Sequence, residues 1–564
     1  MSSGFSRMWL GVGLGLCLAG AAGVSSVRAE GAQAAVPRVI PAVMAGAMAE
    51  ALDMARQSAF RQAVAEAAGR DRDIAAFYRE IGYAAVWTGD DPAHRARRAA
   101  LLRALDDAAL HGLPERRYGR AELVARMADI RSARERGQVE VALSRAYLAY
   151  ARDVQSGVLA PGRVVSDIKR DVPRRPAEDL LAEITRGDPR AVLRALPPQT
   201  NAYRRLMKER LRLEEVIAQG GWGPAVPGGT LEPGDTGTAV IALRDRLVAL
   251  GYLRRSATAR FDGGIESALR AFQADHGLET DGVAGASTIA AVNVSAEERL
   301  ASVLVAMERE RWLPAERGAR HILVNLTDFS ARILDHDSVT FETRAVVGKN
   351  AYDRRSPEFS DEMDHMIVNP TWHVPRSITV NEYLPKMQAN RNAVGHLRLY
   401  DSRGRVVPRS AVNFRAYTAR SFPFALKQPP SNSNALGLVK FMFPNKYNIY
   451  LHDTPQKHLF DREKRDFSHG CIRLAQPFEF AYALLAPQES DPERRFHGAL
   501  DSGRETRIDL ERHVPVHLVY RTAITQAGGR TQYRDDVYGR DARIWQALER
   551  AGVSLLAGRG QPRP

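Results

Sequence analysis

The stretch YLHDTPQKHLFDREKRDFSHGCIRL, residues 450–474, holds three histidines and one of the only two cysteines in a chain of 564 residues. A cysteine is a good nucleophile only as its thiolate, and a nearby imidazole both lowers the thiol pKa and accepts the proton. Cys471 has His469 two residues before it and His452 nineteen residues before it. In a strand–loop–strand turn, a residue about twenty positions earlier reaches the neighbouring strand. His452 is therefore the candidate general base, whereas His469 belongs to the nucleophile's own turn.

Gly470 stands directly before the cysteine and permits backbone conformations closed to other residues. We expect this freedom to turn the N–H groups of residues 470 and 471 toward a developing oxyanion. Two other interpretations stay open on the residues alone. One is a buried, inert thiol. The other is a zinc site. Its candidate ligands are residue types that bind zinc, but their spacing in the sequence matches no common zinc motif: His452, His458, His469 and Cys471.

The N-terminus has the layout of a secretory signal peptide. A cationic start is followed by an apolar run from Met8 to about Ala22, and small residues precede the expected cleavage after Ala29. The run is shorter than the ~20 residues that span a bilayer, which weighs against a retained anchor. We therefore expect a periplasmic protein. Without residues 1–29, Cys471 is an unpaired cysteine in an exported chain, which indicates either an intermolecular bridge or a reactive thiol.

Composition is that of an ordinary globular protein with several domains. Hydrophobic residues make up 45% and charged residues 26% of the chain. The net charge is +14, but the 80 Lys and Arg residues are spread along the chain. Since there are no basic arms or aromatic–basic motifs, nucleic acid is not an expected partner. An exported basic protein instead meets an anionic envelope polymer, or carries the charge for solubility.

Periodicity predicts a multidomain α+β protein. A lead-in segment, residues 30–70, precedes a helical scaffold domain at residues 71–221, in which apolar residues recur at three and four spacing. A Gly/Pro-rich linker leads to a small helical domain, residues 229–294. Residues 295–545 contain short strands separated by turns, which indicate a β-rich domain. The remaining residues, 546–564, are predicted to be a C-terminal tail.

A stretch rich in Pro, Arg, Ser and Asn interrupts the β-rich domain at about residues 374–434. It starts with the helix-like SITVNEYLPKMQANR and otherwise lacks strong periodicity. Inserts of this length are commonly lids or binding loops, so a lid over the site is expected.

Two parts of the chain resemble known families. Residues 229–294, with glycines placed around LGY and FQADHGLETDGVAG, resemble the three-helix peptidoglycan-binding domain. The stretch HDTPQKHLFDREKRDFSHGCIR resembles the signature of the L,D-transpeptidases with the YkuD fold, which is an upstream His, a spacer and Ser/Thr-His-Gly-Cys. Further agreement with the larger YcbB-like branch comes from seven segments: ERERWLP, ILVN, VVGK, SPEFSDEM, IVNPTWHVPRSI, NALGLVKF and YAAVWT.

The resemblance implies a β-rich YkuD-type catalytic domain with an inserted lid, and acyl transfer through the cysteine. Cys471 would attack the carbonyl of the third residue of a stem peptide and release D-Ala. The amine of a second stem would then take the acyl group, which gives a 3-3 cross-link. His452 would be the base, oriented by the backbone carbonyl of Asp453, a position where glycine is common. Three residues would shape the turn: Ser468, His469 and Gly470.

The implied partners are peptidoglycan stem peptides as donor and acceptor, and the glycan polymer on the peptidoglycan-binding domain. No cofactor and no metal are implied, and protein partners are not identified. Arg473 would hold a stem carboxylate through its guanidinium, with a salt bridge to an acidic neighbour as the competing interpretation. The other candidates for the substrate pocket compete with plain core packing: Tyr450, Trp372 and Asn434.

Three other functions compete with cross-linking. An L,D-carboxypeptidase, or a protein-to-peptidoglycan ligase or hydrolase, would use the same site with a different acceptor. A wall-binding protein with a decayed site belongs to a different class. The intact set of His452, Gly470 and Cys471 weighs against decay.

Overall fold

The computed structural model describes residues 42–555, so the expected signal peptide lies outside the described residues. The described residues fall into two units, residues 42–58 and residues 59–555. The first unit contributes the beginning of helix α1 (Ala42–Ala68), where side chains 46–58 are exposed. No helix in the described part of the chain is both long and apolar enough to cross a membrane.

The end of α1 differs from the expected loosely ordered lead-in. Phe60, Val64 and Ala68 are buried and belong to the hydrophobic core of the scaffold domain. They recur every four residues, so they lie on one face of the helix, and burial of that face orders the segment. The scaffold domain therefore begins before residue 71.

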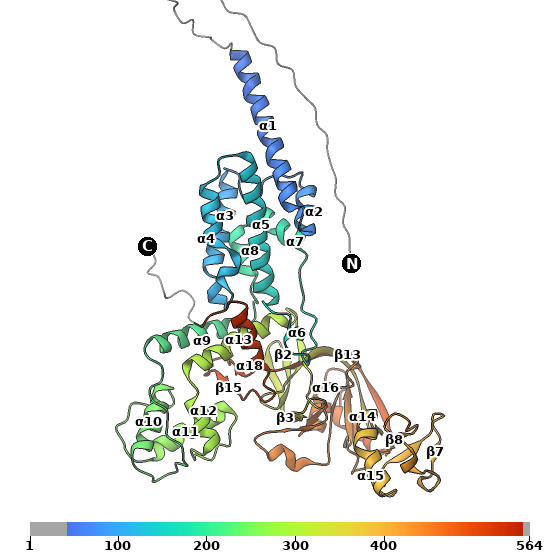
Figure 1. The fold of residues 1–564 in the computed structure, drawn as a ribbon. Helices are drawn as coiled ribbons and strands as arrows, with labels where there is room; N and C mark the ends of the chain where they lie inside the picture. Colours follow the sequence, from blue (N-terminus) through green and yellow to red (C-terminus); the bar gives the residue numbers. More distant parts are fainter. Residues whose placement is uncertain (1–41, 556–564) are drawn as a thin grey trace, which may run out of the picture. The chain divides into compact units, whose positions relative to one another are not determined.

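The scaffold is a helical bundle around this core (Figure 1). Its helices are α2 (Arg72–Glu80), α3 (Pro92–Asp106), η1 (Ala108–His111), η2 (Glu115–Tyr118), α4 (Arg120–Ala128), α5 (Ala133–Ser156), α6 (Pro161–Val164), α7 (Ala177–Arg186) and α8 (Pro189–Ala195). The motif YAAVWT wraps a buried carboxylate of α5. Glu140 accepts hydrogen bonds from the N–H groups of Val86, Trp87 and Thr88. This motif has a structural role.

A second helical core connects the scaffold to the C-terminal end of the chain. It contains α9 (Asn201–Ala218), α13 (Ala296–Trp312) and α18 (Arg540–Arg550) (Figure 1). Ile544, Leu548 and Val553 are buried in it. The expected tail from residue 546 is therefore wrong as far as Val553, because the apolar side chains of this stretch are buried in the same core as α13. Residues 556–564 lie outside the described part.

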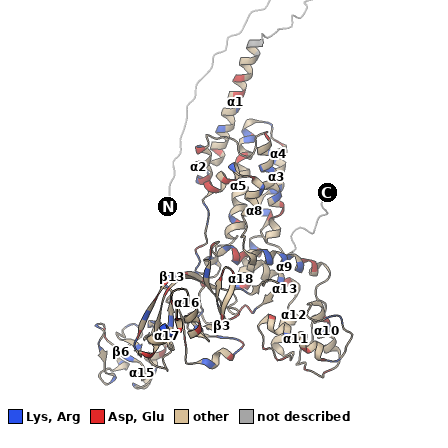
Figure 2. Cartoon of the chain, turned by 180° about the vertical axis from the view of Figure 1, so that it is seen from behind, with Lys and Arg blue, Asp and Glu red and all other residues tan. Residues whose placement is uncertain are grey.

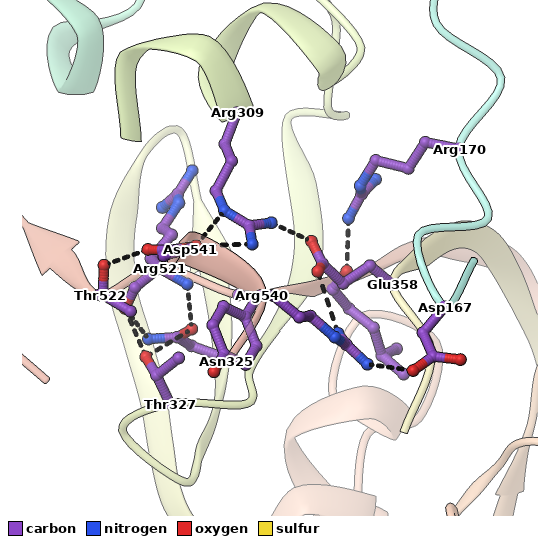
Figure 3. Close-up of polar contacts among 12 residues, drawn as sticks. Asp167, Arg170, Arg309, Asn325, Thr327, Glu358, Arg521, Thr522, Arg540 and Asp541 are labelled. Atoms are coloured by element: carbon purple, nitrogen blue, oxygen red, sulfur yellow. Dashed lines mark hydrogen bonds and ion pairs between the residues drawn. The ribbon is translucent and has the colours of Figure 1, made fainter. Parts of the chain in front are cut away.

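The motif ERERWLP forms the end of α13 and is a buried ion-pair centre. Figure 3 shows Arg309 between Asp541 and Glu358, at 2.7 and 2.6 Å. Burial alone would lower the pKa of Arg309, but the two carboxylates raise it above its usual value. Arg540 approaches the other oxygen of Glu358 at 2.9 Å and Asp167 at 3.7 Å. Helices α13 and α18 are therefore joined to the segment that leads into strand β4 (Phe359–Val368).

The small domain at residues 229–294 has a core of its own. Its helices are α10 (Thr238–Ala249), α11 (Gly263–His276) and α12 (Ala286–Asn293). Leu243, Leu269 and Phe272 are fully buried between them. Three helices match the expected architecture.

The β-rich domain contains a sheet of nine strands in the order β11-β3-β12-β10-β9-β4-β13-β1-β2. Because β3 also pairs with β2, the sheet closes on itself. The strands are β1 (Arg320–Asn325), β2 (Ser330–Asp335), β3 (Ser338–Gly348), β4 (Phe359–Val368), β9 (Val439–Met442), β10 (Leu451–His452), β11 (Asp466–Ser468), β12 (Ile472–Leu474) and β13 (Thr506–Val519). One face carries the main hydrophobic core, to which α16 (Pro477–Leu485) and α17 (Pro492–Asp501) contribute. Strands β14 (Ala523–Ile524) and β15 (Gln532–Tyr533) pair separately.

The insert at residues 374–434 is a folded subdomain. It contains α14 (Arg376–Ile378), the π-helical turn η3 (Thr379–Tyr383) and α15 (Leu384–Ala389). A four-stranded sheet follows in the order β5-β8-β6-β7, from β5 (Trp372–His373), β6 (Arg398–Tyr400), β7 (Val406–Val407) and β8 (Ala425–Gln428), with turns η4 (Arg409–Ala411) and η5 (Phe414–Ala416). Leu399, Phe414 and Leu426 form part of its core. Strands of two to four residues are too short to show a period in the sequence.

Charged side chains occur on elements throughout the described chain. Figure 2 shows Lys and Arg interspersed with Asp and Glu on the scaffold helices and beyond them. The net charge of +14 is therefore distributed.

Candidate active site

The sheet brings Cys471 and His452 onto one face. Strands β10 and β12 run parallel and pair Leu451 with Ile472 and His452 with Arg473. Leu451 and Ile472 are fully buried in the main core. Since side chains alternate along a strand, His452 and Arg473 point to the opposite face, and Cys471, two residues before Arg473, faces the same way. The histidine nineteen residues upstream thus lies on the strand that pairs with β12, directly after Cys471, as expected.

Two cations flank His452 on this face. In register, Lys440 of β9 pairs with His452, which pairs with Arg473 of β12. No carboxylate pairs with either cation among the described residues, and Arg473 donates instead to Gln456 Oε1 at 2.6 Å. Burial lowers the pKa of both Lys440 and Arg473. The competing interpretation of Arg473, a salt bridge to an acidic neighbour, finds no partner in the described part, so two charges remain for an anionic ligand.

The imidazole of His452 is buried and fixed by its neighbour. Its Nδ1 donates to the backbone carbonyl of Asp453, which is the orientation that the resemblance implies. The Asp453 side chain accepts from Leu438 N at 2.9 Å and Lys457 Nζ at 2.6 Å, which fixes this turn without a glycine. Burial, and then the charge of Arg473, lower the pKa of His452 to about 3. With the proton on Nδ1, the neutral ring leaves Nε2 free of hydrogen, as a base requires.

The Cys471 thiol is partly buried in the turn between β11 and β12. Its hydrogen bond goes to the backbone carbonyl of Asn448, 3.5 Å from Sγ. Burial raises its pKa to about 11, against the hydrogen bonds from Tyr450 and the charges of Arg473 and Lys440. The resting thiol is therefore protonated and directed at the Asn448 carbonyl.

The three turn residues have separate roles. Gly470 has φ +114°, a left-handed conformation that favours glycine. Ser468 is buried and pairs with Gly348 of β3, and its carbonyl accepts from Lys349 N at 2.8 Å. Both therefore shape the backbone.

His469 points away from the thiol, to the insert. Its Nε2 lies 2.8 Å from Glu382 Oε1, and Arg354 donates to the same oxygen at 2.9 Å. His469 therefore links the turn of the nucleophile to η3.

Tyr450 and Trp372 lie at the boundary between the site and the insert. Tyr450 is on the same face as His452, with ring centroids 5.7 Å apart. Burial, and then the neighbouring Cys471, raise the pKa of Tyr450 well above its usual value, against a hydrogen bond with Trp372. Trp372 is buried in the core of the insert. These two side chains close the site on one side.

Asn434 is part of the protein core and does not line the substrate pocket. Its side chain is fully buried. The amide nitrogen donates to the carbonyls of Pro370, Gln428 and Pro429, and the oxygen accepts from Leu436 N. Since both ends of the amide bind backbone, Asn434 closes the base of the insert and has no polar atom left for a substrate.

The four zinc-ligand candidates do not come together. His458 is exposed on η6 (Lys457–Asp461), and His469 contacts Glu382. No group of three or more metal-ligating side chains gathers within residues 42–555.

Comparison with known families agrees with this geometry. Residues 319–489 match the family model described as "L,D-transpeptidase catalytic domain". The chain contains a YkuD-type L,D-transpeptidase domain. Residues 236–292 match the model "Putative peptidoglycan binding domain", and residues 72–209 match the model "Scaffold domain".

A curated relative supports the same family. It is named "Putative L,D-transpeptidase", from Haemophilus influenzae, and is 31% identical over 225 residues. The match covers 40% of this chain and 45% of the relative, so the chain spans less than half of the relative's length.

Two solved L,D-transpeptidase structures also match. The one from Xylanimonas cellulosilytica is 17% identical and covers 53% of this chain and 98% of that chain, with a TM-score of 0.17. The one from Stackebrandtia nassauensis is 14% identical and covers 53% and 97%, with a TM-score of 0.21. TM-scores this low support no detailed structural comparison.

Sequence reasoning missed several residues and one strand that lie at or near this candidate site. Lys440 lies in β9, within the run LVKFMF. Because side chains alternate along a strand, Lys440 points away from the core that holds Phe441. Glu382 lies in the helix-like start of the insert, where no sequence signal marks it. Strand β13, which pairs with both β4 and β1, begins after residue 489.

Proposed function

We propose that this protein is an exported, periplasmic L,D-transpeptidase that forms 3-3 cross-links between peptidoglycan stem peptides. The observation that carries the proposal is the arrangement of Cys471 and His452 on one face of the sheet of an L,D-transpeptidase domain. The neighbouring subdomain at residues 374–434 and the two unpaired cations on the same face support it.

The first half-reaction forms a thioester. Cys471 Sγ attacks the carbonyl carbon of the third residue of the donor stem, and its proton passes to Nε2 of His452. Because the resting thiol has a pKa of about 11, the proton leaves as the carbon–sulfur bond forms. The peptide bond to D-Ala breaks, and His452 returns the proton to the leaving amine.

The second half-reaction regenerates the thiol. The side-chain amine of an acceptor stem attacks the thioester, a new carbon–nitrogen bond forms and the carbon–sulfur bond breaks. The amine loses a proton to His452, and sulfur regains one. Water competes with the amine at this stage, so a cover over the site favours cross-linking over hydrolysis. The insert contacts the turn of Cys471 through Glu382 and His469, which supports the proposal that it provides this cover.

Lys440 and Arg473 are proposed to bind a carboxylate of the donor stem. They lie on either side of His452 in the same row of the sheet. An anion held there would be placed beside the base. A guanidinium and an ammonium suit such a group because charge-assisted hydrogen bonds are stronger than neutral ones.

The test uses a chain that begins at residue 30 and tetrapeptide-stem muropeptides. We expect mass spectrometry to show 3-3 linked dimers together with released D-Ala. Cys471→Ala should yield neither product, because it lacks the sulfur that carries the acyl group. Tripeptides alone from the intact protein, with abundant acceptor, would overturn the cross-linking proposal in favour of L,D-carboxypeptidase activity.

A further inference from the structure

Ser356 connects the end of β3 to the turn of the nucleophile. It is fully buried, and it begins the segment SPEFSDEM, which runs into β4. Its hydroxyl accepts a hydrogen bond from Gly348 N at 2.9 Å and donates one to the carbonyl of Gly470 at 2.6 Å. One buried hydroxyl thus fixes the carbonyl directly before Cys471.

The geometry of the peptide bond turns this contact into an orientation of the next N–H. The Gly470 carbonyl and the Cys471 N–H belong to one planar trans peptide, in which they point in opposite directions. With the carbonyl held by Ser356, the N–H of Cys471 points away from Ser356. No acceptor for this N–H is present within residues 42–555, so it is free to bind a ligand.

Ser356 is in turn held from behind by the C-terminal helix. Arg540 Nη2 donates to the Ser356 carbonyl at 2.7 Å, while its Nη1 donates to Glu358 at 2.9 Å. Figure 3 shows Glu358 bound between Arg540 and Arg309. All three charged side chains are buried. An arginine of α18, about 50 residues beyond the end of the family match, therefore supports the turn that carries the nucleophile.

We infer that Ser356 is a positioning residue that aims the Cys471 N–H at the oxyanion of the tetrahedral intermediate. The inference rests on the proposed acyl transfer, since only attack on a carbonyl creates this oxyanion. Ser356 does not touch the substrate. It acts through the Gly470–Cys471 peptide, and Arg540 keeps Ser356 in place.

The test compares two reactions of the same sulfur. Acylation by a β-lactam passes through an oxyanion, whereas alkylation by iodoacetamide does not. Removing one oxyanion donor outright costs about 10²- to 10³-fold in rate. Ser356→Ala frees the peptide to rotate without deleting the donor, so we expect acylation to slow by about tenfold to 10²-fold. Alkylation should stay within about twofold, because the thiol itself is not changed.

Matched variants separate positioning from loss of a buried hydroxyl. Ser330 is also buried and donates to Asp328 at 2.6 Å, away from the site, so Ser330→Ala should leave both rates unchanged. Ser356→Thr keeps the hydroxyl and should restore much of the acylation rate. Arg540→Lys keeps a cation but not the fork that reaches both Ser356 and Glu358. Arg540→Lys should slow acylation less than Ser356→Ala does, and it should likewise leave alkylation unchanged. If Ser356→Ala does not fold, Arg540→Lys tests the inference in its place.

Equal acylation rates in the wild type and in the folded Ser356 and Arg540 variants would overturn this inference but leave the proposed function standing. Parallel loss of acylation and alkylation would also overturn it, because it would show that Ser356 orders the thiol rather than the N–H. A wild type that is alkylated but never acylated would count against the proposed function as well.

Discussion

Iodoacetamide should alkylate Cys471 slowly at neutral pH and progressively faster as the pH rises. Alkylation needs the thiolate, and burial raises the pKa of this thiol to about 11. Burial also lowers the pKa of His452 to about 3. A resting pair of thiolate and imidazolium would need the opposite order of these two pKa values. The structure therefore predicts that both groups are neutral at pH 7.

The size of the effect follows from the thiol pKa. At pH 7 a pKa of about 11 leaves about one thiolate in 10⁴, whereas an ordinary cysteine has about three in 100. The more basic thiolate is about 10 to 20 times more nucleophilic, which offsets part of this difference. We expect alkylation at pH 7 to be about 15 to 30 times slower than for free cysteine. The rate should rise about tenfold per pH unit up to about pH 10.

The assay is selective without further engineering, because a chain that begins at residue 30 has Cys471 as its only cysteine. Mass spectrometry of the labelled protein gives the rate at each pH. In His452→Ala the alkylation rate should change less than about threefold, since a neutral imidazole does not stabilise the thiolate. Acyl transfer should fall by about 10²- to 10⁴-fold, because the base is lost.

Fast alkylation at pH 7, with a midpoint below pH 7 that is lost in His452→Ala, would refute this reasoning. It would show a preformed thiolate–imidazolium pair at the site. The proton transfer described above would then have occurred before the substrate binds.

Three further outcomes follow from the structure. Lys440→Gln should lower kcat/KM for tetrapeptide stems by about 10- to 150-fold, the range for losing a charge-assisted hydrogen bond; an unchanged kcat/KM would exclude Lys440 from substrate binding. Glu382→Gln weakens a partly exposed contact with His469 and Arg354, so the ratio of tripeptide to dimer should rise about 1.5- to 5-fold; a constant ratio would show that this contact does not keep water out. Deleting residues 231–293, which have their own core, should weaken sedimentation with sacculi while β-lactam acylation persists; loss of both would show that the domain braces the fold.

Local sequence patterns mark several strands of the β-rich domain but not all of its elements. The runs at β1, β2, β9 and β10 show alternation or continuous apolar residues, which are local signals. Strand β13 was not anticipated, although it pairs with both β4 and β1. The insert was expected to be irregular and has its own sheet and core. The last residues of α18 were expected to be a tail and are buried.

The sequence by itself determined the chemistry of the site, because that information is local. Cys471 after a turn-forming glycine, and a histidine nineteen residues upstream, predict a nucleophile and a base, and the family resemblance favours this prediction over an inert thiol or a zinc site. Only the tertiary structure decided what surrounds them. Lys440 depends on the register between strands, and register is fixed by packing of the entire core. Ser356 and Glu382 lie about 90 to 115 residues from the turn that they contact, and no periodicity relates positions so far apart. Their contacts exist because the closed sheet and the insert bring these segments together.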